Sequence, residues 1–583
     1  MKYLKIFGVV LIFAFVLTGC GQVKSVNMKN HTETATSEKS DQPDFEQSMI
    51  STDGKDSGNY NDIPEYKYRR KVNIIDDNYR TYYEVFLYSF YDSNGDGIGD
   101  INGLIEKLDY INDGNYDSDY SLGFNGIWLM PVMPARSYHK YDVLDYYDID
   151  PQYGIIDDFK RLVEECNKRG IKLIIDLVIN HTSNQHPWFL SALKSLGIEP
   201  CGKEICTYED LCREHNPYVS YYNFTEGKPD RGNYCHTGIG DWYYEAVFSP
   251  DMPDLNLDNM DLRGDIEDIM KYWLELGVGG FRLDAALHYF SDNTEKNCEV
   301  LAWLNDFVKN YNEKNYLVAE VWTNFGTYSK YYLSNIDSVF NFAFATESGV
   351  IAKTLNNKGS TYSAKAFGEA MIQVQDELKK YSDTAIDAPF FTNHDTARAA
   401  GYFARNSEKI KMAGGMNLMM SGNVFVYYGE ELGMSGSGRD ENKRAPMYWS
   451  DTYREGMTKG PENMDNLEHS FGSVEIQMKD PLSIYNYYKR AIRLRNENPE
   501  IARGVITYMT DITDRDICAI AKTYQNSTIY MLYNISDEKK VITVKKSTYP
   551  YEEIRGYLSA NGEEVKLDGE TVTLPPYSIV ILK

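Results

Sequence analysis

Residues 172–181 read KLIIDLVINH, an apolar run that ends in the polar residues Asn180 and His181. The preceding residues 157–169 carry apolar side chains at three- and four-residue spacing, which is typical of an amphipathic helix. The same alternation of a strand-like run and a helical stretch occurs eight times along the chain. It predicts an α/β fold, a (β/α)8 TIM barrel. The eight predicted strands cover residues 83–90, 126–131, 172–179, 280–284, 317–321, 339–344, 389–392 and 424–428.

Two stretches depart from the barrel pattern. Residues 186–250 follow the third predicted strand and are rich in Gly, Pro, Asn and Tyr, so we expect a small inserted domain there. Residues 499–583 show short strand-like runs separated by polar turns, which predicts a C-terminal antiparallel β-domain. The barrel then consists of residues 65–185 and 251–498.

The N-terminal residues 1–20 are typical of a signal peptide, because a short lysine-containing stretch precedes an apolar run that is too short to span a bilayer comfortably. The run ends in Leu17-Thr18-Gly19-Cys20, which resembles a bacterial lipobox and implies cleavage before Cys20 and a lipid on that cysteine. The alternative is an ordinary secretory signal with an incidental cysteine. Residues 21–64 are polar and predict a disordered tether. We therefore expect an exported lipoprotein, held at the cell membrane and facing the outside of a bacterial cell.

The charge of the chain bears on its partners. The 583 residues contain 60 Lys and Arg against 86 Asp and Glu, which gives a formal net charge of -26. Such a surface repels polyphosphate, so we expect no nucleic-acid partner. No later segment reaches transmembrane length. We expect a monomer.

Polar residues end several of the predicted strands, and in a parallel barrel these carboxyl ends form the active site. The strand ends read DLVINH (176–181), GFRLD (280–284), AEVW (319–322) and FFTNHD (390–395). Arg282 and Asp284 are two apart on a strand and share a face, so the guanidinium can keep the carboxylate ionised. Two carboxylates on either side of a scissile bond suit glycoside hydrolysis. Each acid alone could be a strand-end cap or a surface charge, but the four motifs together argue against that reading.

The ordered motifs DLVINH, GFRLDAALH, AEVW and FFTNHD resemble the four signature regions of the alpha-amylase family, glycoside hydrolase family 13. MPDLN (252–256) is similar to a fifth region, and the N-terminus makes the chain resemble bacterial lipoprotein alpha-amylases. The resemblance implies that Asp284 is the nucleophile, Glu320 the general acid/base and Asp395 the transition-state stabiliser. It also implies that His181, Arg282 and His394 contact the sugar or position the carboxylates. Because the family is retaining, we expect the Asp284 and Glu320 carboxyl groups to lie ~5 Å apart.

The segment SYHKYD (137–142) is similar to a further segment of the family, which implies that His139 and Tyr141 bind and stack on the same sugar. The alternative is an ordinary loop role. Lys140 replaces a glycine of the family pattern, which changes the rim of the site rather than its chemistry.

Residues 92–100 read DSNGDGIGD, with oxygen-bearing residues at positions one, three, five and nine and a glycine at six. Calcium needs such oxygen ligands and such a turn. The family resemblance implies Asp92, Asn94, Asp96 and Asp100 as side-chain ligands, and Ile98 through its carbonyl. The alternative is a solvated acidic turn. The resemblance also makes Asn180 a candidate ligand of a second calcium ion, between the barrel and the insertion.

Four cysteines crowd into the inserted stretch: Cys201, Cys206, Cys212 and Cys235. Outside the cell such a cluster is expected to form disulfides, in one of three possible pairings. A zinc site made of all four thiolates is the alternative, although no C-x-x-C motif occurs there.

The substrate class rests on a few matches to and departures from the family. MPDLN is closer to amylases than to oligo-1,6-glucosidases, and Tyr138 stands where exo-acting relatives carry a chain-end-binding Asp. Arg439, Asp440 and the run 444–449 remain, whereas Leu287 replaces a lysine that amylases use beyond the cleaved bond. We expect an endo-acting alpha-amylase that cleaves α-1,4 bonds of starch and maltodextrins. The alternatives are an exo-acting α-glucosidase or maltogenic enzyme, and a non-catalytic starch-binding lipoprotein.

Overall fold

The computed structural model describes residues 67–206, 208, 211–356 and 361–583, all of which belong to the unit Ser57–Lys583. The signal peptide, Cys20 and the whole of the predicted tether lie outside these residues, so those assignments stay predictions. Within the described ranges, no helix combines the length and the apolar character that crossing a membrane requires.

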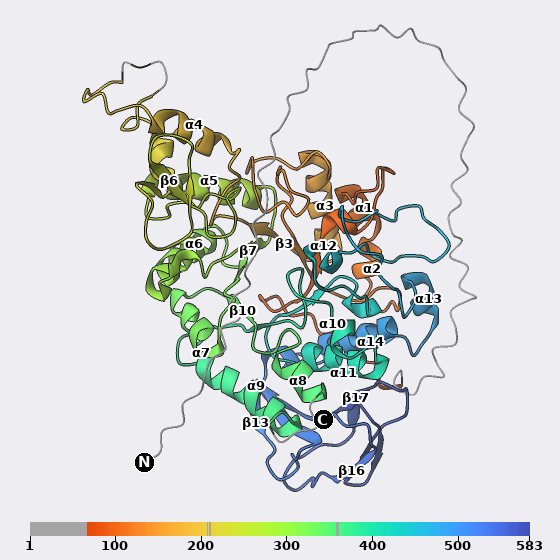
Figure 1. Ribbon diagram of the computed structural model, residues 1–583. Helices are drawn as coiled ribbons and strands as arrows, with labels where there is room; N and C mark the ends of the chain where they lie inside the picture. The colour runs from red at the N-terminus through yellow and green to blue at the C-terminus, as the bar shows by residue number, and fades with distance from the viewer. Residues whose placement is uncertain (1–66, 207, 209–210, 357–360) are drawn as a thin grey trace, which may run out of the picture. The chain divides into compact units, whose positions relative to one another are not determined.

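Eight parallel strands form one sheet in the order β11-β10-β9-β7-β3-β2-β1-β12. Figure 1 labels β3, β7 and β10 of this sheet. A parallel bridge between Phe390 and Phe425 links the two ends of this order, which closes the sheet into a barrel. The (β/α)8 prediction is therefore confirmed. The strands are β1 Thr81–Val85, β2 Gly126–Leu129, β3 Lys172–Leu177, β7 Gly280–Leu283, β9 Tyr316–Ala319, β10 Ser338–Asn341, β11 Ala388–Pro389 and β12 Val424–Tyr427.

Each observed strand ends one to five residues before its predicted end, and two of them show a physical reason. The first was expected to reach residue 90, but β1 ends at Val85 and the 3-10 helix η3 (Leu87–Ser89) follows. The seventh, β11, is only two residues long and ends at Pro389. Proline has no N–H to donate to a strand ladder, which limits how far this strand can pair.

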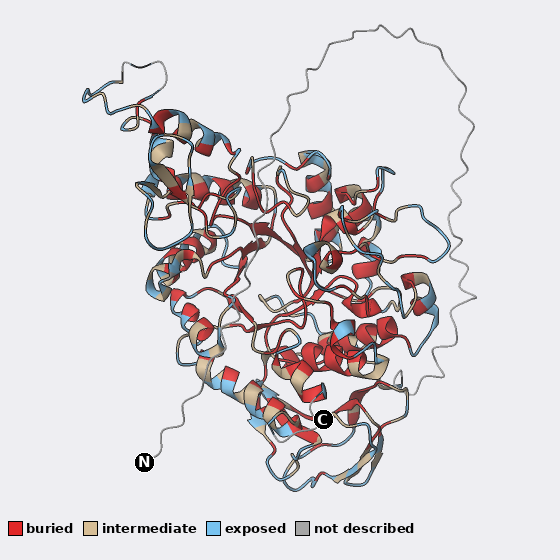
Figure 2. Ribbon diagram, viewed as in Figure 1, coloured by how far each residue is buried: buried red, intermediate tan, exposed pale blue. Residues whose placement is uncertain are grey.

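Among the helices outside the barrel, α3 (Ile156–Lys168) buries one face, whereas α11 (Ser407–Leu418) is buried at every residue from Ile410 to its end (Figure 2). In α3, for example, Phe159, Leu162 and Cys166 are buried, and the spacing of these residues is the helical spacing seen in the sequence. The helices of the barrel are α1 Ile101–Glu106, α2 Leu108–Ile111, α3 Ile156–Lys168, α5 Met260–Glu275, α6 Thr294–Tyr311, α7 Phe325–Tyr328, α8 Val350–Asn356, α9 Ala364–Leu378, α10 Ala399–Tyr402, α11 Ser407–Leu418, α12 Asp440–Lys443, α13 Val474–Lys479 and α14 Ile484–Glu497. Short 3-10 helices, η5 Ser329–Ser334 and η6 Glu430–Leu432, and the strand β8 Tyr289–Asp292 complete it.

The inserted stretch folds between β3 and α5. It contains helix α4 (Pro187–Leu196), the 3-10 helix η4 (Pro217–Tyr221) and a three-stranded antiparallel sheet in the order β4-β6-β5. The strands are β4 Phe224–Glu226, β5 Tyr234–His236 and β6 Trp242–Glu245.

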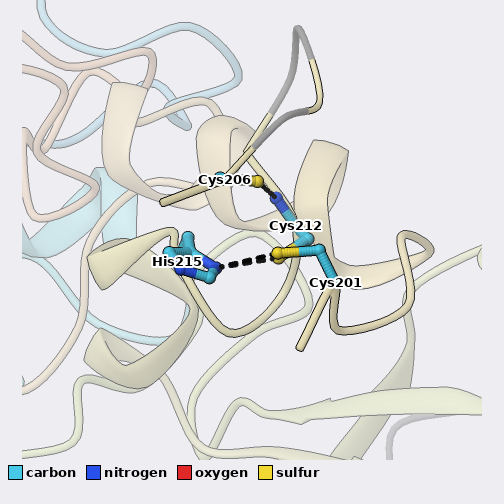
Figure 3. Close-up of side chains that lie close together, drawn as sticks. All are labelled: Cys201, Cys206, Cys212 and His215. Atoms are coloured by element: carbon cyan, nitrogen blue, oxygen red, sulfur yellow. Dashed lines mark hydrogen bonds between the residues drawn. The ribbon is translucent and has the colours of Figure 1, made fainter. Parts of the chain in front are cut away.

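The cysteines of the insertion are free, as are the other cysteines in the described part of the chain. The expected disulfide bonding is therefore wrong for this structure. The thiols of Cys201, Cys206 and Cys212 gather around His215 (Figure 3). Cys235 lies on β5, outside that group, so a site made of all four thiolates is not formed either.

The C-terminal residues form the predicted antiparallel β-domain, which follows the short helix α15 (Glu500–Arg503). It has a five-stranded sheet in the order β13-β14-β15-β20-β17 and a three-stranded sheet in the order β16-β19-β18. The strands are β13 Val505–Tyr508, β14 Ile517–Tyr524, β15 Ser527–Asn534, β16 Lys540–Thr543, β17 Ile554–Ser559, β18 Lys566–Asp568, β19 Thr571–Leu574 and β20 Ser578–Leu582.

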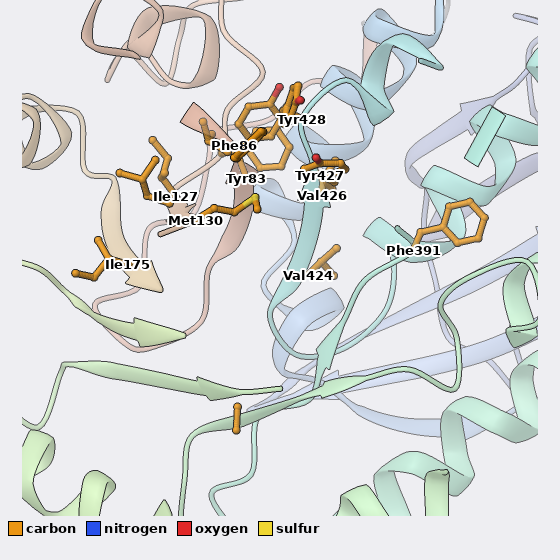
Figure 4. Packing of buried hydrophobic residues seen from close by; sticks show 14 of the residues in the cluster. Tyr83, Phe86, Ile127, Met130, Ile175, Phe391, Val424, Val426, Tyr427 and Tyr428 are labelled. Atoms are coloured by element: carbon orange, nitrogen blue, oxygen red, sulfur yellow. The ribbon is translucent and has the colours of Figure 1, made fainter. Parts of the chain in front are cut away.

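The two-residue period of the barrel strands sorts their side chains between two cores. Tyr83 and Ile127 pack in the large cluster that includes the helix residues (Figure 4), whereas Tyr82 and Trp128 pack in a separate cluster inside the barrel. Tyr82 stacks on the Phe425 ring there, with centroids 4.7 Å apart. The next inward position along β1, two residues beyond Tyr82, is Glu84. An apolar layer thus lies beneath a layer of charged side chains, which begins the active site.

Candidate active site

Three acidic side chains from three different strand ends line one cavity of about 550 Å³. Asp284 follows β7, Glu320 follows β9, and Asp395 follows β11. His139, Tyr141 and His181 line the same cavity. Arg282 and His394 are almost wholly buried behind it. All eight residues predicted for catalysis and sugar binding therefore come together at the carboxyl ends of the strands.

The Arg282 guanidinium connects three carboxylates. Its Nη1 atom donates hydrogen bonds to Asp176 Oδ1 at 2.6 Å and to Asp284 Oδ1 at 2.7 Å. Its Nη2 atom lies 2.7 Å from Glu320 Oε2. None of the Arg282 side chain is exposed to solvent, so these attractions act in a medium of low dielectric constant. The predicted pairing of Arg282 with Asp284 is confirmed, and the guanidinium holds Glu320 as well.

A second buried cation holds Asp395. The His394 ring contacts Glu84 Oε1 through Nδ1 at 2.6 Å and Asp395 Oδ2 through Nε2 at 3.0 Å. Burial disfavours the imidazolium, but the carboxylates of Asp395 and Glu84 outweigh it and raise the pKa of His394 to about 9. Arg444 Nη2 donates to Asp395 Oδ1 at 2.9 Å. Although burial opposes it, the charge of His394, with that of Arg444, keeps the pKa of Asp395 well below its ordinary value.

The proton affinities of Glu320 and Asp395 therefore differ widely. Burial raises the pKa of Glu320 to about 7, even though the charge of Arg282 opposes that change. At neutral pH Glu320 holds a proton for part of the time, while Asp395 stays ionised. In a glycosidase, one carboxyl group must hold the proton that it donates while a neighbouring carboxylate stays ionised. Glu320 and Asp395 differ in this way.

The cavity wall beside Asp284 is aromatic. The Tyr141 ring stacks on the His394 ring, with centroids 5.6 Å apart and planes 15° apart. Its hydroxyl is held by Asp176 Oδ2 at 3.0 Å and by His394 Nε2 at 2.8 Å. This fixes a flat, apolar face that a sugar ring can cover.

Two histidines offer neutral hydrogen-bonding groups to the cavity. Burial, helped by the charge of Arg444, lowers the pKa of His139 to about 4, and burial also lowers the pKa of His181. The buried Nε2 atom of His181 has no hydrogen-bond partner within the protein. A sugar hydroxyl in the cavity would satisfy it, because leaving a buried polar atom unpaired is costly.

Several cavity residues were not predicted as site residues. Phe248 comes from the insertion and Met252 from the segment that follows it. Trp322 also lines the cavity. Its ring stacks on Phe342, with centroids 4.8 Å apart, and half of the Trp322 residue is exposed. Trp322 ends the motif AEVW, so the sequence offered a signal for it. Glu84 offered none, because it lies 310 residues from its partner His394, and the run 444–449 gave no sign that Arg444 contacts Asp395, 49 residues away.

In the predicted calcium loop, the acidic side chains accept hydrogen bonds from nearby backbone N–H groups. The Asp92 carboxylate accepts the N–H groups of Gly95 and Gly97 at 2.6 and 2.7 Å, and Asp100 accepts that of Gly103 at 2.8 Å. Both carboxylates are buried. Asn94 and Asp96 accept N–H groups two residues further along, at 2.9 and 2.7 Å. The loop is thus a stable, oxygen-rich turn, and the binding of calcium, including the role of the Ile98 carbonyl, stays a prediction.

Asn180 lies in a different place from that loop. Its amide nitrogen is 3.4 Å from Asp254 Oδ1. Burial raises the pKa of Asp254 to about 7. A second calcium ion at Asn180 also stays a prediction.

Comparison with known proteins identifies the family. A sequence profile described as "Alpha amylase, catalytic domain" matches residues 84–504, well over half of the chain. The chain belongs to the alpha-amylase family. As a member of this family with the site described above, it is a glycoside hydrolase, which argues against a non-catalytic starch-binding role.

Relatives within the alpha-amylase family differ in their named activities. Alpha-amylase 3 of Dictyoglomus thermophilum is 35% identical over 86% of this chain and 92% of its own. An oligo-1,6-glucosidase of Parageobacillus thermoglucosidasius is 28% identical over 79% of this chain and 90% of its own. Among solved structures, Eubacterium rectale Amy13B is 44% identical with a TM-score of 0.82, covering 89% of this chain and 97% of that one.

The pKa of Glu320 predicts the pH dependence of this family member. If Glu320 must hold a proton to act, kcat/KM is full below its pKa and falls as the pH rises through about 7. Glu320→Gln removes the titrating group, so we expect a loss of about 10²- to 10⁴-fold and no alkaline fall in the residual rate. The measurement is kcat/KM on a maltooligosaccharide as a function of pH.

Glu165→Gln, a change on the outer helix α3, is the matched control and should keep the alkaline fall of the unaltered enzyme. An alkaline fall that persists unchanged in Glu320→Gln would show that another group controls it.

Proposed function

We propose that the protein is an endo-acting alpha-amylase that cleaves α-1,4-glucosidic bonds of starch and maltodextrins with retention of configuration. The observation that carries the proposal is the pairing of Asp284 and Glu320 with the single guanidinium of Arg282. Contacts to one guanidinium bring the two carboxylates near each other, which agrees with a retaining glycosidase, whose carboxyl groups are ≈ 5–5.5 Å apart.

The proposed reaction assigns one task to each acid. Asp284 attacks the anomeric carbon while Glu320 gives its proton to the glycosidic oxygen, which leaves with the cleaved chain. Glu320, now ionised, then takes a proton from water, and the resulting oxygen displaces Asp284 from the sugar. Asp395 stays ionised throughout and faces the positive charge that develops on the ring. His139, Tyr141 and His181 hold the sugar whose bond is cleaved.

Endo action is supported by the end of the cavity near Tyr138. Arg444 Nη1 donates to the Tyr138 hydroxyl at 3.3 Å and Nη2 to Asp395, so both terminal nitrogens of its guanidinium are engaged within the protein. Arg439 donates to the carbonyl of Asn463 and does not line the cavity. Among the described residues that line the cavity, the arginine is Arg444, and with its terminal nitrogens engaged the site suits an internal stretch of glucan rather than a chain end. The 35% identity to a protein named alpha-amylase agrees with this choice.

The alternative is an exo-acting α-glucosidase or maltogenic enzyme. The oligo-1,6-glucosidase among the relatives favours it, as does Leu287, which lines the cavity where amylases have a lysine. The loss of the lysine at position 287 is not a loss of all positive charge, because Lys443, on α12, lines the same cavity.

Digestion of long amylose distinguishes the two. An endo-acting enzyme should abolish the iodine colour after few bonds are broken, with a mixture of maltooligosaccharides as early products. The measurement compares iodine absorbance with reducing ends and chromatographed products over time, with Glu320→Gln as the inactive control. Glucose as the sole early product, while the chains stay long, would rule out endo action.

We also propose that the loop 92–100 binds calcium. Its donor set is made of hard oxygen atoms, as calcium prefers, and Gly95 and Gly97 adopt positive φ angles that turn the chain around it. Asp92, Asn94, Asp96 and Asp100 would hold the ion with the Ile98 carbonyl. The ion would stabilise the loop after β1 rather than take part in bond cleavage.

Thermal unfolding tests the calcium proposal. A chelator first removes any bound calcium. Adding calcium back at about a hundred times its dissociation constant should then add about 2.7 kcal/mol to the unfolding free energy and raise Tm. Asn94→Ala should lose this response, whereas Asn115→Ala, in an exposed turn of the same kind, should keep it. A Tm that does not respond to calcium in the unaltered protein contradicts the proposal.

Export and lipid anchoring at Cys20 belong to the same proposal and rest on the sequence Leu17-Thr18-Gly19-Cys20. Mass spectrometry of the mature N-terminus in the membrane fraction checks this assignment. An N-terminus that begins elsewhere, or carries no lipid, would overturn it.

A further inference from the structure

A compact group of metal-binding side chains lies in the insertion, outside the active-site cavity. It consists of Cys201, Cys206, Cys212 and His215, in the loop between α4 and η4 (Figure 3). Their sulfur and nitrogen ligand atoms all lie within 4.8 Å of one another. His215 Nδ1 is 3.1 Å from Cys212 Sγ and 3.7 Å from Cys201 Sγ.

We propose that this group binds one zinc ion through three thiolates and one imidazole. A tetrahedral ion with Zn–S bonds of ≈ 2.3 Å and Zn–N bonds of ≈ 2.0–2.1 Å requires ligand atoms about 3.3–3.8 Å apart. The two distances to His215 lie close to this range. Soft thiolates with an imidazole select zinc over calcium or magnesium, which prefer oxygen.

The backbone fixes two of the four ligands. Cys212 and His215 stand at the two ends of a tight turn, in which the N–H groups of His215 and Asn216 donate to the Cys212 carbonyl at 2.9 and 3.1 Å. Asn216 then anchors this turn to α4, because its side-chain amide donates to Ser191 and Ser195 at 2.8–3.0 Å. Half of the site is therefore held in place by hydrogen bonds that do not involve a metal.

The other half lies on a loop whose described apolar side chains are exposed. The side chains of Ile205 and Leu211 are 78% and 43% exposed, so the loop gains little from apolar burial. The Cys206 sulfur contacts the turn as the acceptor of the Cys212 N–H group, at 3.4 Å. A metal that joins Cys201 and Cys206 to the turn would supply the cross-link that a loop with exposed apolar side chains needs.

A disulfide explains the group less well than a metal does. Three thiols cannot all pair with one another, and Cys235, which would complete two pairs, lies outside the group. Any one disulfide within the group would leave a thiol beside an imidazole, both of which are ligands. In sequence the pattern is C-x4-C-x5-C-x2-H, so the signal was the histidine three residues after Cys212.

The proposed ion has a structural role. All four positions of a tetrahedral ion would be filled by protein, which leaves no place for water or substrate. None of the four residues lines the active-site cavity, but Phe248, at the other end of the insertion, does. The zinc would hold the outer loop of the domain that contributes this wall.

Metal analysis of the full chain tests the proposal. Protein purified without chelators, or incubated with zinc under reducing conditions and then desalted, should contain one zinc per chain. The variants Cys201→Ser, Cys206→Ser, Cys212→Ser and His215→Ala should each lower this by about tenfold or more. Cys235→Ser and Cys298→Ser, which change free thiols outside the group, should keep one zinc. Cobalt in place of zinc should give thiolate-to-metal charge-transfer absorption in the unaltered protein, and Cys212→Ser should lose it.

Two results would overturn the proposal. One is an unaltered protein that takes up no zinc and gives no cobalt spectrum, with a disulfide between any two of the three cysteines in a non-reduced peptide map. The other is zinc that stays bound in all four ligand variants, which would place it elsewhere. If a variant fails to fold, the zinc content and cobalt spectrum of the unaltered chain still decide. Since zinc content does not depend on amylose cleavage, this test is separate from that of the proposed function.

Discussion

The contacts between the Arg282 guanidinium and the carboxylates of Asp176, Asp284 and Glu320 constrain the whole active site. Carboxylates brought together inside a barrel repel one another and lose their hydration, so without a cation they would take up protons or move apart. Breaking a buried ion pair costs about 3–5 kcal/mol, because it leaves the remaining charge uncompensated. One arginine therefore permits several acids to share a cavity while their proton affinities remain different.

The barrel supplies this arrangement through the two-residue period of its strands. Apolar side chains such as Tyr82, Ile174 and Val318 fill the inner cluster. Two residues beyond each of these three lies a buried acid: Glu84, Asp176 and Glu320. Glu84 in turn charges His394, which with Arg444 keeps Asp395 ionised. Glu320 has the weaker compensation and so keeps a pKa of about 7. The chemistry of each acid thus follows from which cations it contacts.

The sequence predicted the barrel and the acids well, because both depend on local patterns. The apolar runs and the polar residues that end them are visible in one stretch such as 172–181, and the fold then brings these ends together. The end of β1 was missed, since the apolar run continues into the 3-10 helix η3. The partners Glu84 and Arg444 were missed because only the closed barrel places them beside His394 and Asp395. The cysteines were misjudged for a similar reason, as counting thiols leaves His215 out of the group.

The stereochemistry of cleavage tests the central claim most directly. If Arg282 holds Asp284 and Glu320 close enough for direct attack on the sugar, the new reducing end must form with the α configuration of the bond that was cleaved. Proton NMR spectra recorded during the first minutes of maltooligosaccharide hydrolysis, before the anomers interconvert, show which form appears first. We expect the α-anomer to appear first. Initial release of the β-anomer would mean that water attacks directly between more widely separated carboxylates, and would contradict it.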